Sequence, residues 1–77
     1  MNLSDLKPED TAVIDKINIK GELGRRLLDM GLVPSTRIVF RRTAPFSGPV
    51  QISVLGYELC IRKSDAERIT VSRVNAQ

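Results

Sequence analysis

Histidine and tryptophan are absent from this sequence of 77 residues, and cysteine occurs only once. Histidine is the usual general base near neutral pH and the commonest metal-binding side chain. The single cysteine, Cys60, can form neither an internal disulfide nor, by itself, a thiolate metal site. We therefore expect no enzymatic activity, no cofactor and no metal site within the monomer. Two Cys60 thiols could still share a metal ion across a dimer, which leaves room for a weak homo-oligomer.

Long apolar runs are missing as well. The first ten residues, MNLSDLKPED, contain acids and a proline where a signal peptide needs an apolar stretch. No segment approaches the roughly 18 apolar residues of a membrane helix. An unpaired cysteine is typical of a reducing compartment, and we interpret Cys60 as a small buried or half-buried hydrophobic residue. These features predict a cytoplasmic protein that reaches the membrane only through a partner.

Positive charge is unevenly distributed along the chain. Residues 1–36 contain five Lys and Arg against six Asp and Glu, a balance of −1, whereas residues 37–77 contain seven against three, a balance of +4; together they give the net charge of +3. Such a basic half could face an acidic protein, a phosphate or a nucleic acid, but it is more often a solvated surface.

Alternating apolar and polar residues predict strands in five short segments. The segments are 11–19, 36–43, 50–54, 57–62 and 69–71. In the first segment, the apolar residues switch from even-numbered to odd-numbered positions. Such a switch is typical of a strand that twists or bends. The residues expected in the core are Ile14, Leu27, Ile38, Phe40, Ile52, Val54, Leu59 and Ile69.

One segment has a helical period instead. Leu23, Leu27 and Met30 are spaced i, i+4, i+7 and would share one stripe of a short helix within residues 21–31. Gly31 stands where a helix end needs a left-handed residue, and Leu32 can pack back on the last turn.

The outer side of this helix carries charges and one further leucine. Glu22 with Arg26, and Arg25 with Asp29, are spaced to form i, i+4 ion pairs. Leu28 lies about 100° around the helix from the apolar stripe. It either reaches a neighbouring loop or is exposed for a partner.

A second helical signal precedes the last strand. Ser64 and Glu67 have the spacing of a capping box, with room for a single turn. The fold class predicted from these elements is mostly β: a small closed five-stranded barrel with one short helix after the first strand and a helical turn before the last. Closure would remove exposed sheet edges. A length of 77 residues allows one domain, which we expect to cover residues 1–77 with its core at about 3–71.

Three ordered segments resemble the motifs of the FeoA family. They are RRLLDMGLVPST (25–36), RTAPFSGP (42–49) and GYELCIRKSDA (56–66), with Ser35 and Phe46 standing where glycine and leucine are common. The resemblance runs from Leu3 to Val71. It implies an SH3-like barrel in its stand-alone form, a role in ferrous iron uptake, and action beside FeoB, a membrane transporter whose cytoplasmic portion carries a GTP-binding domain. Family relatives among metal-dependent repressors make metal binding a family-level description, but this chain has no evident ligand set.

A small barrel must bind a partner through its loops and outer faces, because its interior is filled by packed side chains. We predict a partner surface in which Phe46, Leu28 and Leu32 dock on the transporter and nearby arginines steer it toward an acidic patch. The residues assigned to this surface are Leu28, Leu32, Arg41, Arg42, Pro45 and Phe46.

Two other functions compete with the transporter hypothesis. The basic half would suit a barrel that binds RNA or the ribosome, but Phe40, Phe46 and Tyr57 are the only aromatic residues, too few for a convincing base-stacking platform. A groove for proline-rich peptides would need more aromatic residues for the same reason. We therefore expect no nucleic-acid partner.

Overall fold

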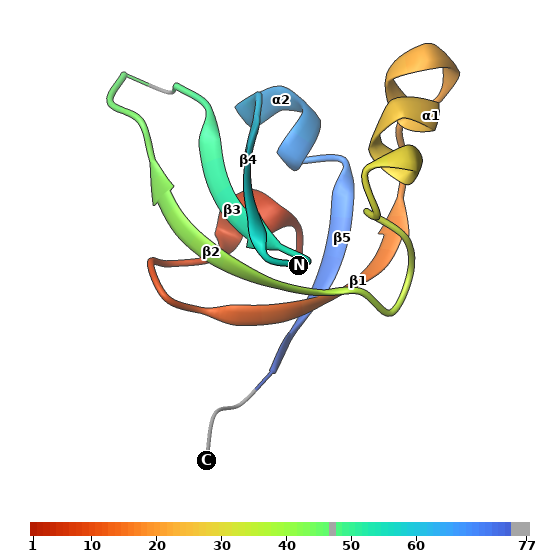
Figure 1. Ribbon diagram of the computed structural model, residues 1–77. Helices are drawn as coiled ribbons and strands as arrows, with labels where there is room; N and C mark the ends of the chain where they lie inside the picture. The colour runs from red at the N-terminus through yellow and green to blue at the C-terminus, as the bar shows by residue number, and fades with distance from the viewer. Residues whose placement is uncertain (47, 75–77) are drawn as a thin grey trace.

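Five antiparallel strands curl into a partly open barrel in the computed structural model, which describes residues 1–46 and 48–74 (Figure 1). The elements, in chain order, are η1 (Leu3–Asp5), β1 (Thr11–Ile17), α1 (Gly21–Asp29), β2 (Arg37–Thr43), β3 (Val50–Val54), β4 (Tyr57–Ile61), α2 (Lys63–Ala66) and β5 (Ile69–Val74). The predicted five strands, the helix after the first strand and the helical turn before the last are confirmed.

The expectation of full closure is wrong. The strand order is β4-β3-β2-β1-β5, so β4 and β5 are the two edges of the sheet and do not pair with each other. The outer edge of β5 is covered by the start of the chain, because the Val71 amide donates to the Met1 carbonyl at 2.9 Å and Asn2 forms a bridge with Thr70. Among the described residues, no strand covers the outer edge of β4.

Apolar side chains from all five strands fill the barrel. Seven of the eight predicted core residues are buried: Ile14, Leu27, Ile38, Phe40, Ile52, Val54 and Ile69. The eighth, Leu59, is only half-buried and packs on the margin of the core. It lies on β4, which has no neighbouring strand on its outer side among residues 1–46 and 48–74. No polar or charged residue within the described part of the chain is buried.

A β-bulge explains the change of parity in β1. The register with β5 shifts between Ile14 and Lys16, so Asp15 is the extra residue. An extra residue in one strand bends it and reverses which side chains face inward. Ala12 and Ile14 are buried before the bulge, and the half-buried Ile17 packs on the core after it.

The end of α1 is a Schellman motif, as Gly31 predicts. Gly31 has φ +94° and its amide donates to the Leu28 carbonyl, while the Leu32 amide donates to the Leu27 carbonyl at 3.0 Å. Leu32 and Leu27 both lie in the buried core. This arrangement satisfies the last helical carbonyls and turns the chain sharply toward β2.

Three local expectations are corrected. Ser64 lies inside α2 rather than at its cap; Arg62 is the N-cap and makes no side-chain capping bond. The ion pairs expected along α1 are absent from the described residues, as is common for exposed pairs. Cys60 is exposed, because it points to the outer face of an edge strand.

Candidate partner-binding site

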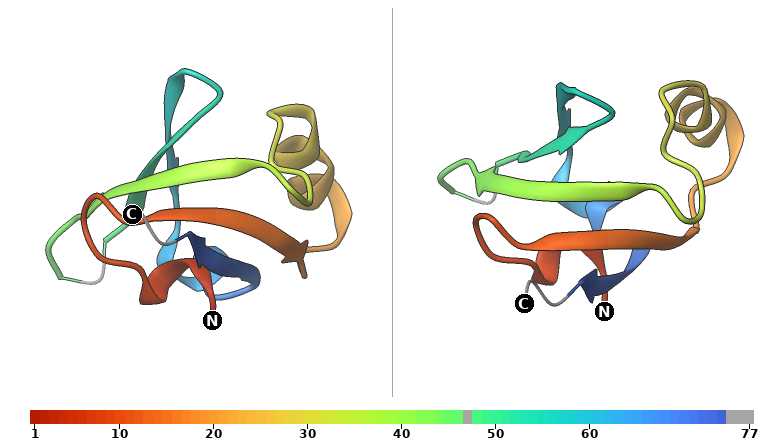
Figure 2. Two further views of the ribbon diagram at one scale, coloured as in Figure 1. Left: turned by 90° about the horizontal axis from the view of Figure 1, so that it is seen from below. Right: turned by 60° about the horizontal axis from the view of Figure 1, so that its bottom comes forward.

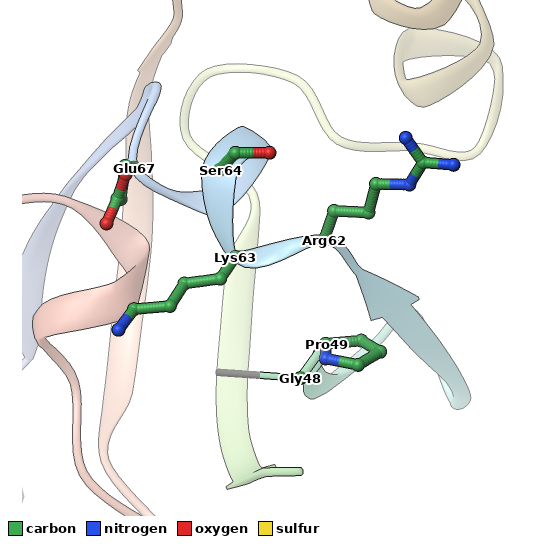
Figure 3. Close-up of a pocket in the computed structure, with 6 residues that line it drawn as sticks. All are labelled: Gly48, Pro49, Arg62, Lys63, Ser64 and Glu67. Carbon is green, nitrogen blue, oxygen red and sulfur yellow. The ribbon is translucent and has the colours of Figure 1, made fainter. Parts of the chain in front are cut away.

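A hollow of about 530 Å³ lies beside the start of α2. Gly48 and Pro49 form one side of it, and Arg62, Lys63, Ser64 and Glu67 the other. Figure 3 shows that the side chains of Arg62 and Lys63 point away from each other rather than toward a common centre. A small-molecule site needs a few polar groups that converge on one ligand, so this hollow does not have the form of one.

A second hollow, of about 360 Å³, separates α1 from β4 and is called here the α1–β4 groove. Its lining residues are Leu23, Leu27, Cys60, Ile61, Arg62 and Asp65. Leu27 and Ile61 are buried at its base, whereas the Leu23 side chain is 40% exposed. The groove thus has apolar side chains on α1 and at the end of β4, and one charge of each sign, Arg62 and Asp65, at its α2 end.

The wall formed by β4 is a strand edge. In the hairpin, Tyr57 is paired with Val54 across the two-residue turn Leu55-Gly56, whose φ angles of 51° and 86° are those of a type I′ turn. Paired residues beside such a turn exchange hydrogen bonds, and the exchange then alternates along the ladder. The amide and carbonyl groups of Glu58 and Cys60 consequently point outward, and no backbone partner is found for them among the described residues.

The other end of α1 contacts the β3–β4 turn and holds the two walls together. The Tyr57 hydroxyl donates to the Met30 carbonyl, and the Leu55 side chain lies directly over Gly31. The turn and α1 project from the same side of the β1–β2 layer (Figure 2). This contact fixes the position of α1 relative to β4, so the groove has two supported walls.

The structure does not bring the predicted docking residues together. Phe46 is fully exposed and Leu28 is 48% exposed, so both side chains are accessible to a partner. The β2–β3 loop that carries the exposed Pro45 and Phe46, however, lies at the opposite side of the barrel from α1 (Figures 1 and 2). Leu32 is completely buried in the core, so its assignment to a partner surface is wrong.

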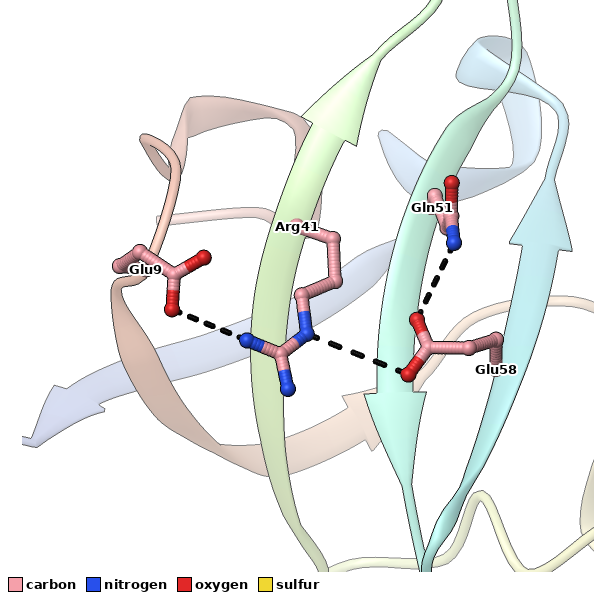
Figure 4. A network of polar contacts seen from close by, with 4 residues as sticks. All are labelled: Glu9, Arg41, Gln51 and Glu58. Carbon is pink, nitrogen blue, oxygen red and sulfur yellow. Dashed lines mark hydrogen bonds and ion pairs between the residues drawn. The ribbon is translucent and has the colours of Figure 1, made fainter.

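The two arginines of this prediction differ in their surroundings. Arg41 is part of a polar network on the outer face of β2, β3 and β4, where it contacts Glu9 at 2.9 Å and Glu58 at 4.0 Å (Figure 4). Gln51 donates to the same Glu58 carboxylate. These carboxylates compensate the charge of Arg41. Arg42 is exposed and takes part in none of the ion pairs among the described residues.

The aromatic residues do not form a stacking platform. Phe40 is buried in the core. Phe46 lies on the β2–β3 loop, and Tyr57 begins β4 next to the end of α1. Bases of a single-stranded nucleic acid would need neighbouring exposed rings, and these two rings are on different parts of the barrel.

Residues 1–46 and 48–74 contain neither a cluster of metal ligands nor a helix that could span a membrane. No three His, Cys, Asp or Glu side chains gather there in a way that could hold a metal ion. In the same residues, no helix combines the length and apolar character needed to cross a bilayer.

The family model that describes the FeoA domain matches residues 1–73. The chain belongs to the FeoA family. It is 33% identical over 76 residues to a Fe(2+) transport protein A/Fe(2+) transporter FeoB fusion protein from Porphyromonas gingivalis, an alignment that covers 99% of this chain and 9% of that protein. The chain thus spans less than a tenth of the length of this curated relative.

Solved structures of FeoA proteins have the same fold. The solution structure of FeoA from Chlorobium tepidum superposes with a TM-score of 0.92 at 34% identity, covering 100% of this chain and 73% of that one. FeoA from Stenotrophomonas maltophilia, crystallised with zinc and described as a prokaryotic SH3 domain protein, gives a TM-score of 0.80 at 25% identity over 94% of this chain and 89% of that one. The expected SH3-like fold is confirmed.

Sequence reasoning missed the residues of the α1–β4 groove. Leu23, Cys60, Ile61 and Arg62 were assigned to strand, helix or core positions, not to a site. The available signal was the alternation in residues 57–61, which shows a strand but not that its outer edge stays open. That property depends on which strand lies beside it in space.

Proposed function

We propose that this chain is an accessory protein of ferrous iron uptake that binds the cytoplasmic region of a FeoB-type transporter and modulates Fe²⁺ transport. One observation carries the proposal: in the Porphyromonas gingivalis relative, a segment similar to this whole chain is part of the same polypeptide as a FeoB transporter. Covalent linkage gives two domains a high effective concentration for each other. Such a linkage favours binding between domains that act together.

The geometry supports a binding role rather than catalysis. The two hollows described above present apolar side chains beside β4 and polar side chains that diverge beside α2. The exposed apolar residues include Leu28, Leu55 and Phe46. Contiguous apolar patches mark protein contacts, whereas single exposed apolar side chains are common on soluble domains. In this proposal the protein works in the cytoplasm, at the inner membrane through its partner, and the transporter's GTP-binding region is the surface that it contacts.

Only some of the residues first predicted for the docking surface are kept in the proposal. Leu28 on α1, and Pro45 and Phe46 on the β2–β3 loop with the neighbouring Arg42, remain candidate contacts as two separate patches. They could both touch a large partner such as a transporter, but not one compact epitope.

Co-purification from native membranes tests the proposal. A tagged chain, expressed at its natural level, should retain the FeoB-type transporter of the same organism after detergent extraction, and an unrelated SH3-like domain with the same tag should not. Deletion of the gene should change the initial rate of Fe²⁺ uptake, and the tagged chain should restore it. The proposal is wrong if the transporter is never retained and uptake of Fe²⁺ is unchanged by the deletion.

A further inference from the structure

We propose that the α1–β4 groove binds an extended segment of the transporter, which adds to the free edge of β4 as a sixth strand. This inference rests on the proposed function and specifies how the partner is held. It starts from the open side of the barrel, where β4 ends the sheet without a neighbour among the described residues.

The hydrogen-bonding groups at this edge select an extended backbone. Glu58 and Cys60 each present one amide and one carbonyl outward, a pattern repeated every second residue along β4. A strand placed beside β4 would pair with these groups at the usual spacing of about 4.8 Å. Main-chain pairing of this kind supplies affinity in peptide recognition by sheet edges, while the side chains supply specificity.

The lining of the groove indicates that the strand edge itself is one of its walls. Cys60 and Ile61 point to opposite faces of the sheet, since neighbouring residues of a strand alternate, yet both line the same hollow. This is expected where the hollow meets the strand edge at the end of β4. Glu58 lies earlier in β4 and is not one of the lining residues, so an added strand would extend beyond the hollow to pair with it. Leu59, half-buried on the core side of β4, is the residue that an added strand would cover.

The opposite wall limits the occupant to a single segment. Leu23 and Leu27 of α1 line the same 360 Å³ hollow as β4 does. The contacts of Tyr57 with Met30 and of Leu55 with Gly31 hold the helix in that position. A second copy of this chain would have to bring its own β4 together with β3 behind it into the space beside α1. A single extended segment has no such requirement.

The side chains of the groove describe the sequence that it should accept. Alternate residues of the added strand would face Leu23, Leu27 and Ile61, so those positions should be apolar. Arg62 is exposed at the α2 end and takes part in none of the ion pairs among the described residues, while Asp65 beside it is half-buried. A carboxylate in the occupant would pair with Arg62 there. The expected segment has alternating apolar residues and one acidic residue at its end.

A substitution at Cys60 tests the pairing. Cys60→Pro removes the outward amide but no hydrogen bond to β3, because that amide faces away from β3; edge strands tolerate proline at such positions. Cys60→Ala, the matched control, removes the thiol and keeps the amide. Leu23→Lys changes the other wall at an exposed side chain, so it tests the groove even if the proline variant does not fold. Urea denaturation first establishes which variants fold.

Binding is measured to the purified FeoB-type transporter and to overlapping peptides of about 12 residues that cover its cytoplasmic sequence. The wild type and Cys60→Ala should bind the transporter equally and select peptides with the expected pattern. Cys60→Pro and Leu23→Lys should bind about tenfold more weakly or worse, the loss expected from one strand-pairing bond and from a polar group in an apolar channel.

Amide hydrogen exchange gives a residue-level readout. In the ¹⁵N-labelled free chain, the amides of Glu58 and Cys60 should exchange fast while those of Leu59 and Ile61, paired with β3, should exchange slowly. The tightest-binding peptide should slow the exchange of Glu58 and Cys60. Unchanged exchange at both residues would overturn the inference.

The remaining outcomes separate the two proposals. If the wild type captures the transporter and both groove variants, correctly folded, capture it equally well, the groove inference is wrong and the proposed function stands. If the wild type does not capture the transporter, the proposed function fails and this inference fails with it. If sedimentation shows a homodimer that Cys60→Pro abolishes, the edge belongs to a second copy and the inference is overturned.

Discussion

Gly31 connects the fold to the groove, and its replacement by alanine has a cost that can be worked out. The residue has φ +94°, and a Cβ built there would lie 2.3 Å from the Leu55 Cδ1 atom. The left-handed backbone costs a non-glycine residue about 1–2 kcal/mol. Leu55, 68% exposed, can rotate away, at about 0.5–1.5 kcal/mol for leaving its rotamer. Together these give a loss of about 1.5–3.5 kcal/mol in the free energy of unfolding.

Gly21 supplies the matched control. It has φ +79°, but a Cβ there would meet nothing within 4 Å. Gly21→Ala should therefore lose only the backbone term, about 1–2 kcal/mol. In a Leu55→Ala background, Gly31→Ala should fall to the same cost, because the clashing methyl group is gone. This double-mutant cycle isolates the contact between the turn and the helix end.

Urea denaturation followed by far-UV circular dichroism measures these differences. A domain of this length has a free energy of unfolding of about 4–12 kcal/mol. The loss expected for Gly31→Ala is smaller than most values in that range, so the variant should remain folded at room temperature. Its melting temperature should fall by roughly 6–28 °C, at about 4–8 °C per kcal/mol. Equal costs for Gly31→Ala and Gly21→Ala, with no coupling to Leu55, would refute the reasoning.

Three further predictions follow from burial and chemistry. Leu32→Ala should lower the free energy of unfolding by about 2–5 kcal/mol, because it leaves a cavity in the core. Substitution of the exposed Leu28 by alanine should change that free energy by about 0.5 kcal/mol or less. Urea denaturation compares the two variants, and equal losses of stability would contradict the packing of the helix end. Phe46→Ala should leave the melting temperature within about 3 °C of the wild type, and a larger fall would mean that the ring packs on the barrel. Calorimetry of the monomer with Fe²⁺ or Zn²⁺ should show no sub-micromolar binding, because the chain has no imidazole and only one thiol to offer with its carboxylates; a tight monomeric site would contradict this.

Much of the fold could be predicted because its signals are local. The helix end at Gly31 depends on a backbone conformation that glycine adopts easily, and the strands depend on alternation over a few residues. The family could be predicted from three short motifs in a fixed order, and the match over residues 1–73 confirms it. The start of α2 was placed wrongly because Ser64 and Glu67 have capping-box spacing while the helix begins one residue before Ser64.

The candidate site was predicted poorly because surfaces are assembled from distant parts of the chain. Leu28 and Leu32 are four residues apart, yet one is 48% exposed and the other fully buried, since the Schellman turn directs Leu32 inward. Phe46 is fully exposed, as a residue of a docking surface must be. Its distance from α1 is a property of the curled sheet, which carries the β2–β3 loop to the opposite side (Figure 2).

By itself, the sequence determined what chemistry this protein has at its disposal: no imidazole, one thiol, a basic second half, and five strands with one short helix. These properties depend on composition or on residues close together in the chain. Only the tertiary structure decided that the barrel stays open between β4 and β5, that the start of the chain covers one edge, and that α1 stands beside the other. Strand pairing is a long-range choice, made by packing among residues far apart in sequence, so the free edge of β4 could be found only in the folded chain.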